Sequence, residues 1–123
     1  MDFDELSNRV IGCALEVHRH LGPGLLESTY DECLAQELDL SGIGFKRQWP
    51  VAIEYKGRKL HSAYRIDFLV EEKLIVELKS IDEVAPIHEA QLLTYMRHAG
   101  VSIGLLINFN TRVLKDGIRR FVL

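Results

Sequence analysis

The sequence predicts an α/β (α+β) fold, in which helices flank a mixed central β-sheet, with the element order ααβββαββ. Apolar residues recur at helical spacing through the first 40 residues, and short extended runs follow. A third helical segment then precedes two final strands, so one sheet receives strands from both halves of the chain. The length of 123 residues is typical of one domain, residues 1–123.

Two helices come first. Residues 3–21 carry apolar side chains every three or four positions, and the Gly-Pro-Gly sequence at 22–24 ends this helix. The second helix is predicted over residues 25–40, ending at Ser41-Gly42. Both helices are expected to pack on the sheet.

Three strands follow, over residues 48–55, 63–70 and 74–80. Lys56-Gly57-Arg58 is the predicted turn between the first two, and residues 71–73 connect the second and third. A third helix over residues 87–98 is opened by a proline at 86 and closed by a glycine at 100. The last two strands are predicted over residues 102–109 and 117–122.

The pairing of the second and third strands brings two carboxylates together. Because side chains alternate, matching the apolar faces of these strands requires paired residue numbers with an even sum. A three- or five-residue connection centred on Glu72 gives a sum of 144, which places Asp67 opposite Glu77 with Cβ atoms about 5 Å apart. The sequence therefore predicts an acidic pair on two apolar strands.

Such a pair favours a metal site. Two carboxylates about 5 Å apart repel by roughly 3 kcal/mol at an effective dielectric constant near 20. Lys79 lies on the same face as Glu77 and offsets part of this repulsion, but a divalent cation would offset more. The alternative is a solvated strand face with an ordinary ion pair between Glu77 and Lys79.

Glu27 is a further candidate. On a helical wheel it falls with Tyr30 and Leu34, so its carboxylate points along the apolar stripe, where an unpaired charge is costly. The competing interpretation takes Gly24 as the N-cap and Glu27 as the third residue of the helix, a favourable position for an acid.

Gln91 and Tyr95 lie four residues apart on the third helix and border its apolar stripe. A glutamine and a tyrosine at the edge of a core are more often packing residues than members of a site, and both interpretations are kept at this point.

The charge, the cysteines and the apolar runs of the chain argue against some classes of protein. With 15 basic and 18 acidic residues the net charge is −3, which argues against a purely electrostatic nucleic-acid binder. Cys13 and Cys33 read as reduced thiols, and the acidic N-terminus has no apolar region of a signal peptide. No apolar run approaches the length of a membrane span, so we expect a soluble cytoplasmic protein.

The motifs together resemble a known family. Gly24, Glu27 and Tyr30 stand in the G-x-x-E-x-x-Y arrangement of the GxxExxY proteins, which belong to the PD-(D/E)xK nuclease superfamily. Asp67 followed by Glu77-Leu-Lys79 looks like the D…E-x-K core of that superfamily, and the segment from Gln91 to Tyr95 resembles the Q-x-x-x-Y motif of its RecB-type nucleases. The resemblance covers essentially the whole chain.

The resemblance implies a restriction-endonuclease-like core and metal-assisted hydrolysis of phosphodiester bonds. Asp67 and Glu77 would hold Mg²⁺ or Mn²⁺, and Lys79 would orient the attacking water or neutralise developing charge. Glu27 would accept a hydrogen bond from a water at the site or assist a second ion. Gln91 and Tyr95 would position the substrate or support the site from behind.

The implied partner is nucleic acid, DNA more than RNA, and a homo-oligomer or larger assembly is possible. Basic residues that could follow a phosphate backbone occur in two groups, and ordinary solvated surface explains them equally well; they are Lys56, Arg58 and Lys59, and Arg112, Lys115, Arg119 and Arg120. The alternative function is a non-catalytic module that retains the nuclease fold and binds nucleic acid or protein.

Overall fold

A five-stranded mixed sheet forms the centre of the molecule in the computed structural model, which describes residues 3–61 and 64–123. Its strands, in spatial order, are β1 (Phe45–Pro50), β4 (Arg65–Val70), β5 (Leu74–Lys79), β6 (Ile103–Asn108) and β7 (Ile118–Val122). The β5–β6 pair is parallel, and the other three pairs are antiparallel. The predicted fold class is confirmed.

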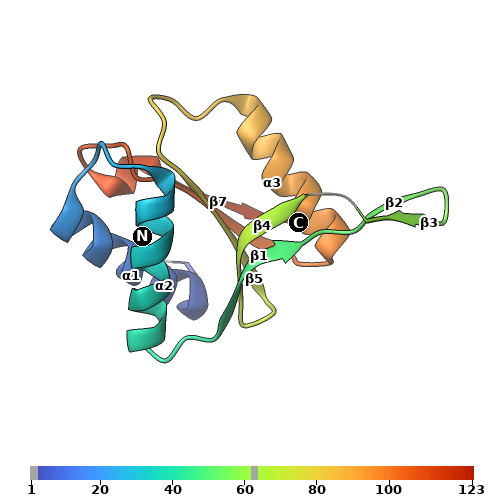
Figure 1. Ribbon diagram of the computed structural model, residues 1–123, viewed down its shortest axis with the longest axis horizontal. Coiled ribbons are helices and arrows are strands. Elements are labelled where there is room, and N and C mark those ends of the chain that lie inside the picture. Colours follow the sequence, from blue (N-terminus) through green and yellow to red (C-terminus); the bar gives the residue numbers. More distant parts are fainter. Residues whose placement is uncertain (1–2, 62–63) are drawn as a thin grey trace.

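Helices cover both faces of this sheet (Figure 1). α1 (Glu5–Leu21) and α2 (Glu27–Leu40) share one apolar core with the side chains of Phe68, Val76 and Leu78. α3 (Pro86–Ala99) packs on the opposite face in a second core. Pro86 is the first residue of α3, and Gly100 ends it in the left-handed conformation, as the sequence predicts.

The first predicted strand is the main difference from expectation. In place of one strand over residues 48–55, the chain forms β1 and then a separate hairpin of β2 (Ile53–Tyr55) and β3 (Arg58–Leu60). Pro50 has no N–H to donate, which suits the last residue of an edge strand. Lys56 and Gly57 both have positive φ, which is the turn geometry of a two-residue hairpin. The predicted start of the next strand at Ala63 lies outside the described residues.

The connection between β4 and β5 agrees with the predicted register. Val70 pairs with Leu74 and Phe68 with Val76, so paired numbers sum to 144 across a three-residue turn at 71–73. Glu71 and Glu72 adopt positive φ in this turn. Glu71 is held there by the Gly44 amide, which donates to its carboxylate at 3.0 Å.

The regular pairing of β4 stops at Asp67. The ladder to β5 ends at Phe68, and the ladder to β1 omits the Gln48–Asp67 pair. Phe68 packs in the first core, but Ile66, expected on the same face, packs in the second. The alternation of side chains between the two faces of the sheet therefore breaks at Asp67. Its carboxylate does not follow the face that regular alternation would give it.

Both cysteines are free thiols, with Cys13 buried and Cys33 half-buried. Within residues 3–61 and 64–123, no helix has the length and apolar character that crossing a bilayer requires.

Candidate active site

The loop before α2 sets the position of Glu27. Gly22 and Gly24 have φ of 68° and 94°, a backbone conformation that favours glycine. The Tyr30 hydroxyl donates to the Gly22 carbonyl at 2.6 Å and accepts from the Leu25 amide at 3.2 Å. The buried Tyr30 ring also stacks on Phe109 at the end of β6, 4.5 Å between centroids. The glycine and tyrosine of the motif thus fix the loop from which α2 begins.

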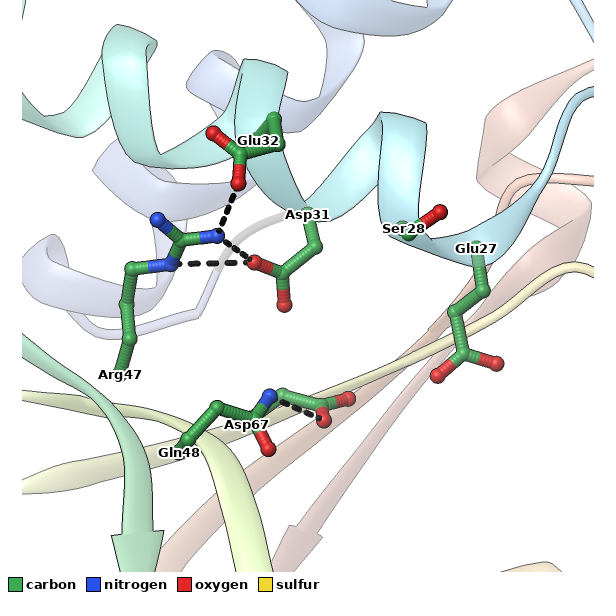
Figure 2. A pocket seen from close by; sticks show the side chains of 7 residues that line it. All are labelled: Glu27, Ser28, Asp31, Glu32, Arg47, Gln48 and Asp67. Carbon is green, nitrogen blue, oxygen red and sulfur yellow. Dashed lines mark hydrogen bonds and ion pairs between the residues drawn. The ribbon is translucent and has the colours of Figure 1, made fainter.

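The N-cap of α2 is Leu26, so Glu27 is the first helical residue. The interpretation that made Gly24 the N-cap and Glu27 the third residue is wrong, because the chain enters the helix two residues later. Glu27 remains in the first turn, where the helix dipole favours an acid. Its side chain is directed from α2 towards the sheet (Figure 2).

The Glu27 carboxylate lies within the electrostatic reach of the predicted site. Partial burial raises its pKa above the ordinary value of 4.5, the charge of Asp67 raises it further, and Lys79 lowers it. The residue as a whole stays open to solvent. Glu27 therefore combines access to water with a weakened tendency to ionise.

Asp67 and Glu77 are joined where the strand ladder ends. Asp67 donates its backbone N–H to Glu77 Oε1 at 3.1 Å, and Leu78 donates its N–H to Asp67 Oδ2 at 2.8 Å. Each carboxylate therefore replaces a carbonyl of the ladder as the acceptor for an amide of the opposite strand. The two acidic groups are built into the strand pairing instead of projecting from it.

Among the acids that the structure describes, Glu77 has a pKa far from its ordinary value. Its side chain lies in the sheet interior, and the residue is 7% exposed. Burial raises its pKa to about 9, with a further contribution from Asp67, while Lys79 acts in the opposite direction. At neutral pH and without a cation, Glu77 therefore holds a proton beside Asp67.

The segment after β5 ties Lys79 to the Glu27 loop. The Lys79 carbonyl accepts from the Phe109 amide at 2.9 Å, and the Ser80 hydroxyl donates to the Leu25 carbonyl at 2.5 Å. The buried side chain of Asn108 bonds both the amide and the carbonyl of Ile81. These contacts hold the end of β5 against the loop that precedes α2.

A cleft of about 470 Å³ opens between α2 and the strands (Figure 2). Its lining includes the predicted residues Glu27 and Asp67, together with five residues that sequence reasoning missed: Ser28, Asp31, Glu32, Arg47 and Gln48. Asp31 follows Glu27 by four positions on α2, so a second acid on the same helix face was a usable signal. Arg47 had no such signal, because its position depends on how β1 pairs with β4.

Arg47 closes one wall of the cleft. Its Nε donates to Asp31 Oδ1 at 3.0 Å, and a second guanidinium nitrogen contacts both Asp31 and Glu32. Asp31 is buried, at 8% exposure, and desolvation raises its pKa although Arg47 lowers it. The guanidinium also lies 5.9 Å from the centroid of the Phe68 ring. The hydrogen bonds of Arg47 to Asp31 and Glu32 hold α2 against β1 beside Asp67.

We expect Arg47→Leu to lower the free energy of unfolding by about 1–3 kcal/mol, because it strands the buried Asp31 charge. The double substitution Asp31→Asn with Arg47→Leu should recover part of that loss, since no charge is then left unpaired. Urea titrations of the three proteins measure the effect. Equal losses in the single and double variants would show that the ion pair itself carries little energy.

Gln48 contacts Asp67 Oδ1, the carboxylate oxygen that does not accept from the Leu78 amide. Its side-chain amide donates to Asp67 Oδ1 at 3.4 Å, and its backbone has a φ of 49°, unusual for a residue other than glycine. Asp67 Oδ2 is already engaged by Leu78, so Oδ1 is the oxygen that faces the cleft. Gln48 therefore marks the oxygen that is available to a ligand.

Gln91 and Tyr95 lie apart from this cleft. They line a second groove of about 340 Å³ between α3 and the β2–β3 hairpin, with Ile53, Tyr64 and Ile87 among its other residues. Gln91 is exposed, and Tyr95 is buried, at 7% exposure. Burial raises the pKa of Tyr95, and the charge of Glu77 raises it further, so the Tyr95 hydroxyl is within electrostatic reach of the acidic pair. The structure brings Tyr95 near Glu77 but leaves Gln91 in the other groove.

The chemistry of the acidic pair fits a hard divalent cation. It offers carboxylate oxygens that are incompletely bonded, and the high pKa of Glu77 reflects its burial first and the neighbouring charge of Asp67 second. Across the described parts of the chain, no three His, Cys, Asp or Glu side chains form a ready metal cluster. Mg²⁺ commonly binds through one or two carboxylates and retains water as its other ligands, so two donors suffice.

A family model described as the PD-(D/E)XK nuclease superfamily matches residues 4–121 of the chain. Neither a curated protein nor a solved structure gives a significant match. The matched region includes every residue of the cleft and both strands that carry the acidic pair.

Proposed function

Because this chain belongs to the PD-(D/E)XK nuclease superfamily, we propose that it is a divalent-metal-dependent nuclease that hydrolyses phosphodiester bonds, with DNA the preferred substrate over RNA. The observation that carries the proposal is the linkage of the Asp67 and Glu77 carboxylates to the two strands through the backbone amides of Leu78 and Asp67, beside Lys79 and Glu27. Two acids placed this close together repel each other when both are ionised, and a bound cation would offset that repulsion.

Asp67 and Glu77 would hold Mg²⁺ or Mn²⁺. When bound, the cation lowers the pKa of water and offsets charge that develops on the phosphoryl oxygens. Asp67 would contribute Oδ1, the oxygen that the Leu78 amide leaves free. Glu77 must lose its proton before it can act as a ligand, so its raised pKa makes cation binding dependent on pH.

Lys79 and Glu27 would act on the water and the phosphate. Lys79 supplies a fixed positive charge beside the acidic pair, which suits the stabilisation of a developing negative charge. Glu27 is open to solvent and has a raised pKa, which suits a group that accepts a hydrogen bond from the attacking water. Tyr95 would support Glu77 from behind, and Gln91 would contact substrate that extends over α3.

We further propose that the chain is one of the GxxExxY proteins and acts in the cytoplasm, either alone or in a homo-oligomer. The structural roles of Gly24, Glu27 and Tyr30 support the narrower family, because each acts in one continuous loop–helix unit that faces the acidic pair. The free thiols support a reducing compartment.

We expect cleavage of at least one substrate in a panel of single- and double-stranded DNA and RNA incubated with Mg²⁺ or Mn²⁺. Lys79→Ala should reduce the rate by about 10²- to 10³-fold, because it removes a positioned charge from the transition state. Lys73→Ala, in the β4–β5 turn, is the matched control and should cleave at the wild-type rate. Gel electrophoresis of end-labelled strands measures both.

Absence of cleavage by the wild-type protein on every substrate, with nucleic-acid binding retained, would favour the non-catalytic module. Equal rates for Lys79→Ala and the wild type would show that Lys79 has no part in the reaction.

A further inference from the structure

The β2–β3 hairpin projects away from the body of the molecule (Figure 1). We call residues 53–60 the basic hairpin. Its two strands pair with each other and with no other described strand, and all three residues of β3 are exposed. An isolated two-stranded hairpin has little stability of its own in water. Packing therefore does not account for the composition of its outer part.

The tip of the basic hairpin concentrates positive charge. Lys56, Arg58 and Lys59 occur within four residues, and Glu54 is the one acid between residues 53 and 60. In the described parts of the chain, none of these three cations forms a salt bridge. On a chain with a net charge of −3, this is a local excess of unpaired positive charge.

The second basic group differs in this respect. Arg119 is paired with Glu89 at 2.9 Å, and Arg120 is paired with Asp4 at 2.8 Å. Two of its four cations are therefore engaged in holding β7 to α3 and to the start of α1. The basic hairpin is the better candidate for a polyanion.

The basic hairpin leaves the sheet at the end that carries Asp67. Pro50 pairs with Arg65, two residues before Asp67, and the Val51 amide donates to the Tyr64 carbonyl at 3.0 Å. Measured as extended chain from Asp67 through this bond, Lys56 lies at most about 31 Å away. That upper limit corresponds to about nine phosphates along one strand of a duplex, which are spaced about 3.4 Å apart.

We propose that the basic hairpin binds the phosphate backbone of a nucleic-acid duplex several base pairs from the bond cleaved at the Asp67–Glu77 site. This inference rests on the proposed nuclease function and adds a second contact to it. A duplex is stiff over this distance, so one bound in the cleft would keep its distant phosphates at a defined place. Three adjacent cations on a hairpin tip match a run of backbone phosphates without reading bases.

The test compares binding of long and short duplexes by fluorescence anisotropy in Mg²⁺ across a salt series. All proteins carry Glu77→Gln, so that cleavage does not interfere. The hairpin variant adds Lys56→Ala, Arg58→Ala and Lys59→Ala, and the matched control adds Lys73→Ala, Arg9→Ala and Arg19→Ala, three exposed cations outside both basic groups and the same change in charge. The ligands are a linear duplex of about 30 base pairs and a stem-loop of about six, whose stem of about 20 Å is shorter than the full reach to the hairpin tip.

The hairpin variant should bind the long duplex at least tenfold more weakly, and its salt slope should fall by about 2–3, as expected for three lost phosphate contacts. Its affinity for the stem-loop should stay within twofold of the parent, and the control should bind the long duplex within threefold. Far-UV circular dichroism and melting establish that the exposed hairpin substitutions leave the fold intact.

Equal affinities of parent and hairpin variant for the long duplex would overturn the inference and leave the proposed function standing. Equal losses in the control would also overturn it, because they would reflect overall charge. A parent that binds no duplex at all would overturn the proposed function itself. A dimeric parent that becomes monomeric in the hairpin variant would instead identify the hairpin as a contact between two copies of the chain.

Discussion

Glu77→Gln will melt at or above the wild-type temperature in the presence of chelator, while any nuclease activity falls by orders of magnitude. Glutamine keeps the oxygen that accepts from the Asp67 amide, and its NH₂ group takes the place of the proton that wild-type Glu77 holds beside Asp67. The fold thus loses no hydrogen bond. The site loses one anionic ligand, which removes the cation on which the proposed reaction depends.

The pH dependence of stability supplies a second measure of the same residue. The pKa of Glu77 rises from 4.5 in the unfolded chain to about 9 in the fold, so folding favours its protonated form. This contribution to stability is complete below pH 4.5 and is lost as the pH rises towards 9. In chelator, the wild-type protein should therefore lose stability between pH 5 and pH 9, by up to about 3 kcal/mol at pH 7 relative to Glu77→Gln.

Glu83→Gln is the matched control, since Glu83 is exposed and the substitution removes the same charge. It should retain the wild-type activity and the wild-type dependence on pH. A markedly lower melting temperature for Glu77→Gln in chelator would contradict the interpretation and favour a structural ion pair between Glu77 and Lys79, in which removal of one partner costs several kcal/mol.

Asp67→Asn will abolish the stabilisation that Mn²⁺ gives to the wild-type protein. A cation that binds only the folded state at a hundredfold excess over its Kd adds about 3 kcal/mol, or a rise of about 10 °C in melting temperature for a chain of this size. Asparagine retains an oxygen for the Leu78 amide but removes the negative charge that the cation requires. Differential scanning calorimetry with and without Mn²⁺ measures the shift.

Asp116→Asn, at an exposed position before β7, should show the full wild-type shift. The wild-type shift should also be larger at pH 8 than at pH 6, because the cation competes with the proton on Glu77. A shift that survives in Asp67→Asn would exclude Asp67 as a ligand and move the metal to other acids of the cleft, Glu27 and Asp31 first among them.

Local patterning in the sequence was sufficient for most of the fold. The helical spacing of residues 3–21, the proline at 86 and the glycine at 100 each act within one turn of backbone, so their effect is visible without tertiary information. The same holds for the parity argument for the register of β4 and β5, which is confirmed from Val70–Leu74 to Phe68–Val76, although the regular pairing stops before Asp67.

Other features required the assembled sheet. The start of α2 at Glu27, after the N-cap Leu26, depends on two contacts of Tyr30. Its hydroxyl hydrogen-bonds to the preceding loop, and its ring stacks on Phe109, almost eighty residues later in the chain. Ile66 packs in the second core because carboxylate oxygens replace backbone carbonyls as hydrogen-bond acceptors at Asp67. The strand propensities of single residues do not predict such an exchange of acceptors.

The candidate site divides in the same way. Residue type and spacing were enough to select Glu27, Asp67, Glu77 and Lys79. Only the pairing of β1 with β4 places Arg47 against Asp31 and Gln48 against Asp67. Only the packing of α3 places Gln91 and Tyr95 in a separate groove, while Tyr95 stays within the electrostatic reach of Glu77. Alternation along a strand determines which face of the sheet a side chain takes. Contacts between distant segments determine which charged groups are buried together. The burial of Glu77 beside Asp67, which such contacts produce, sets the pKa of Glu77.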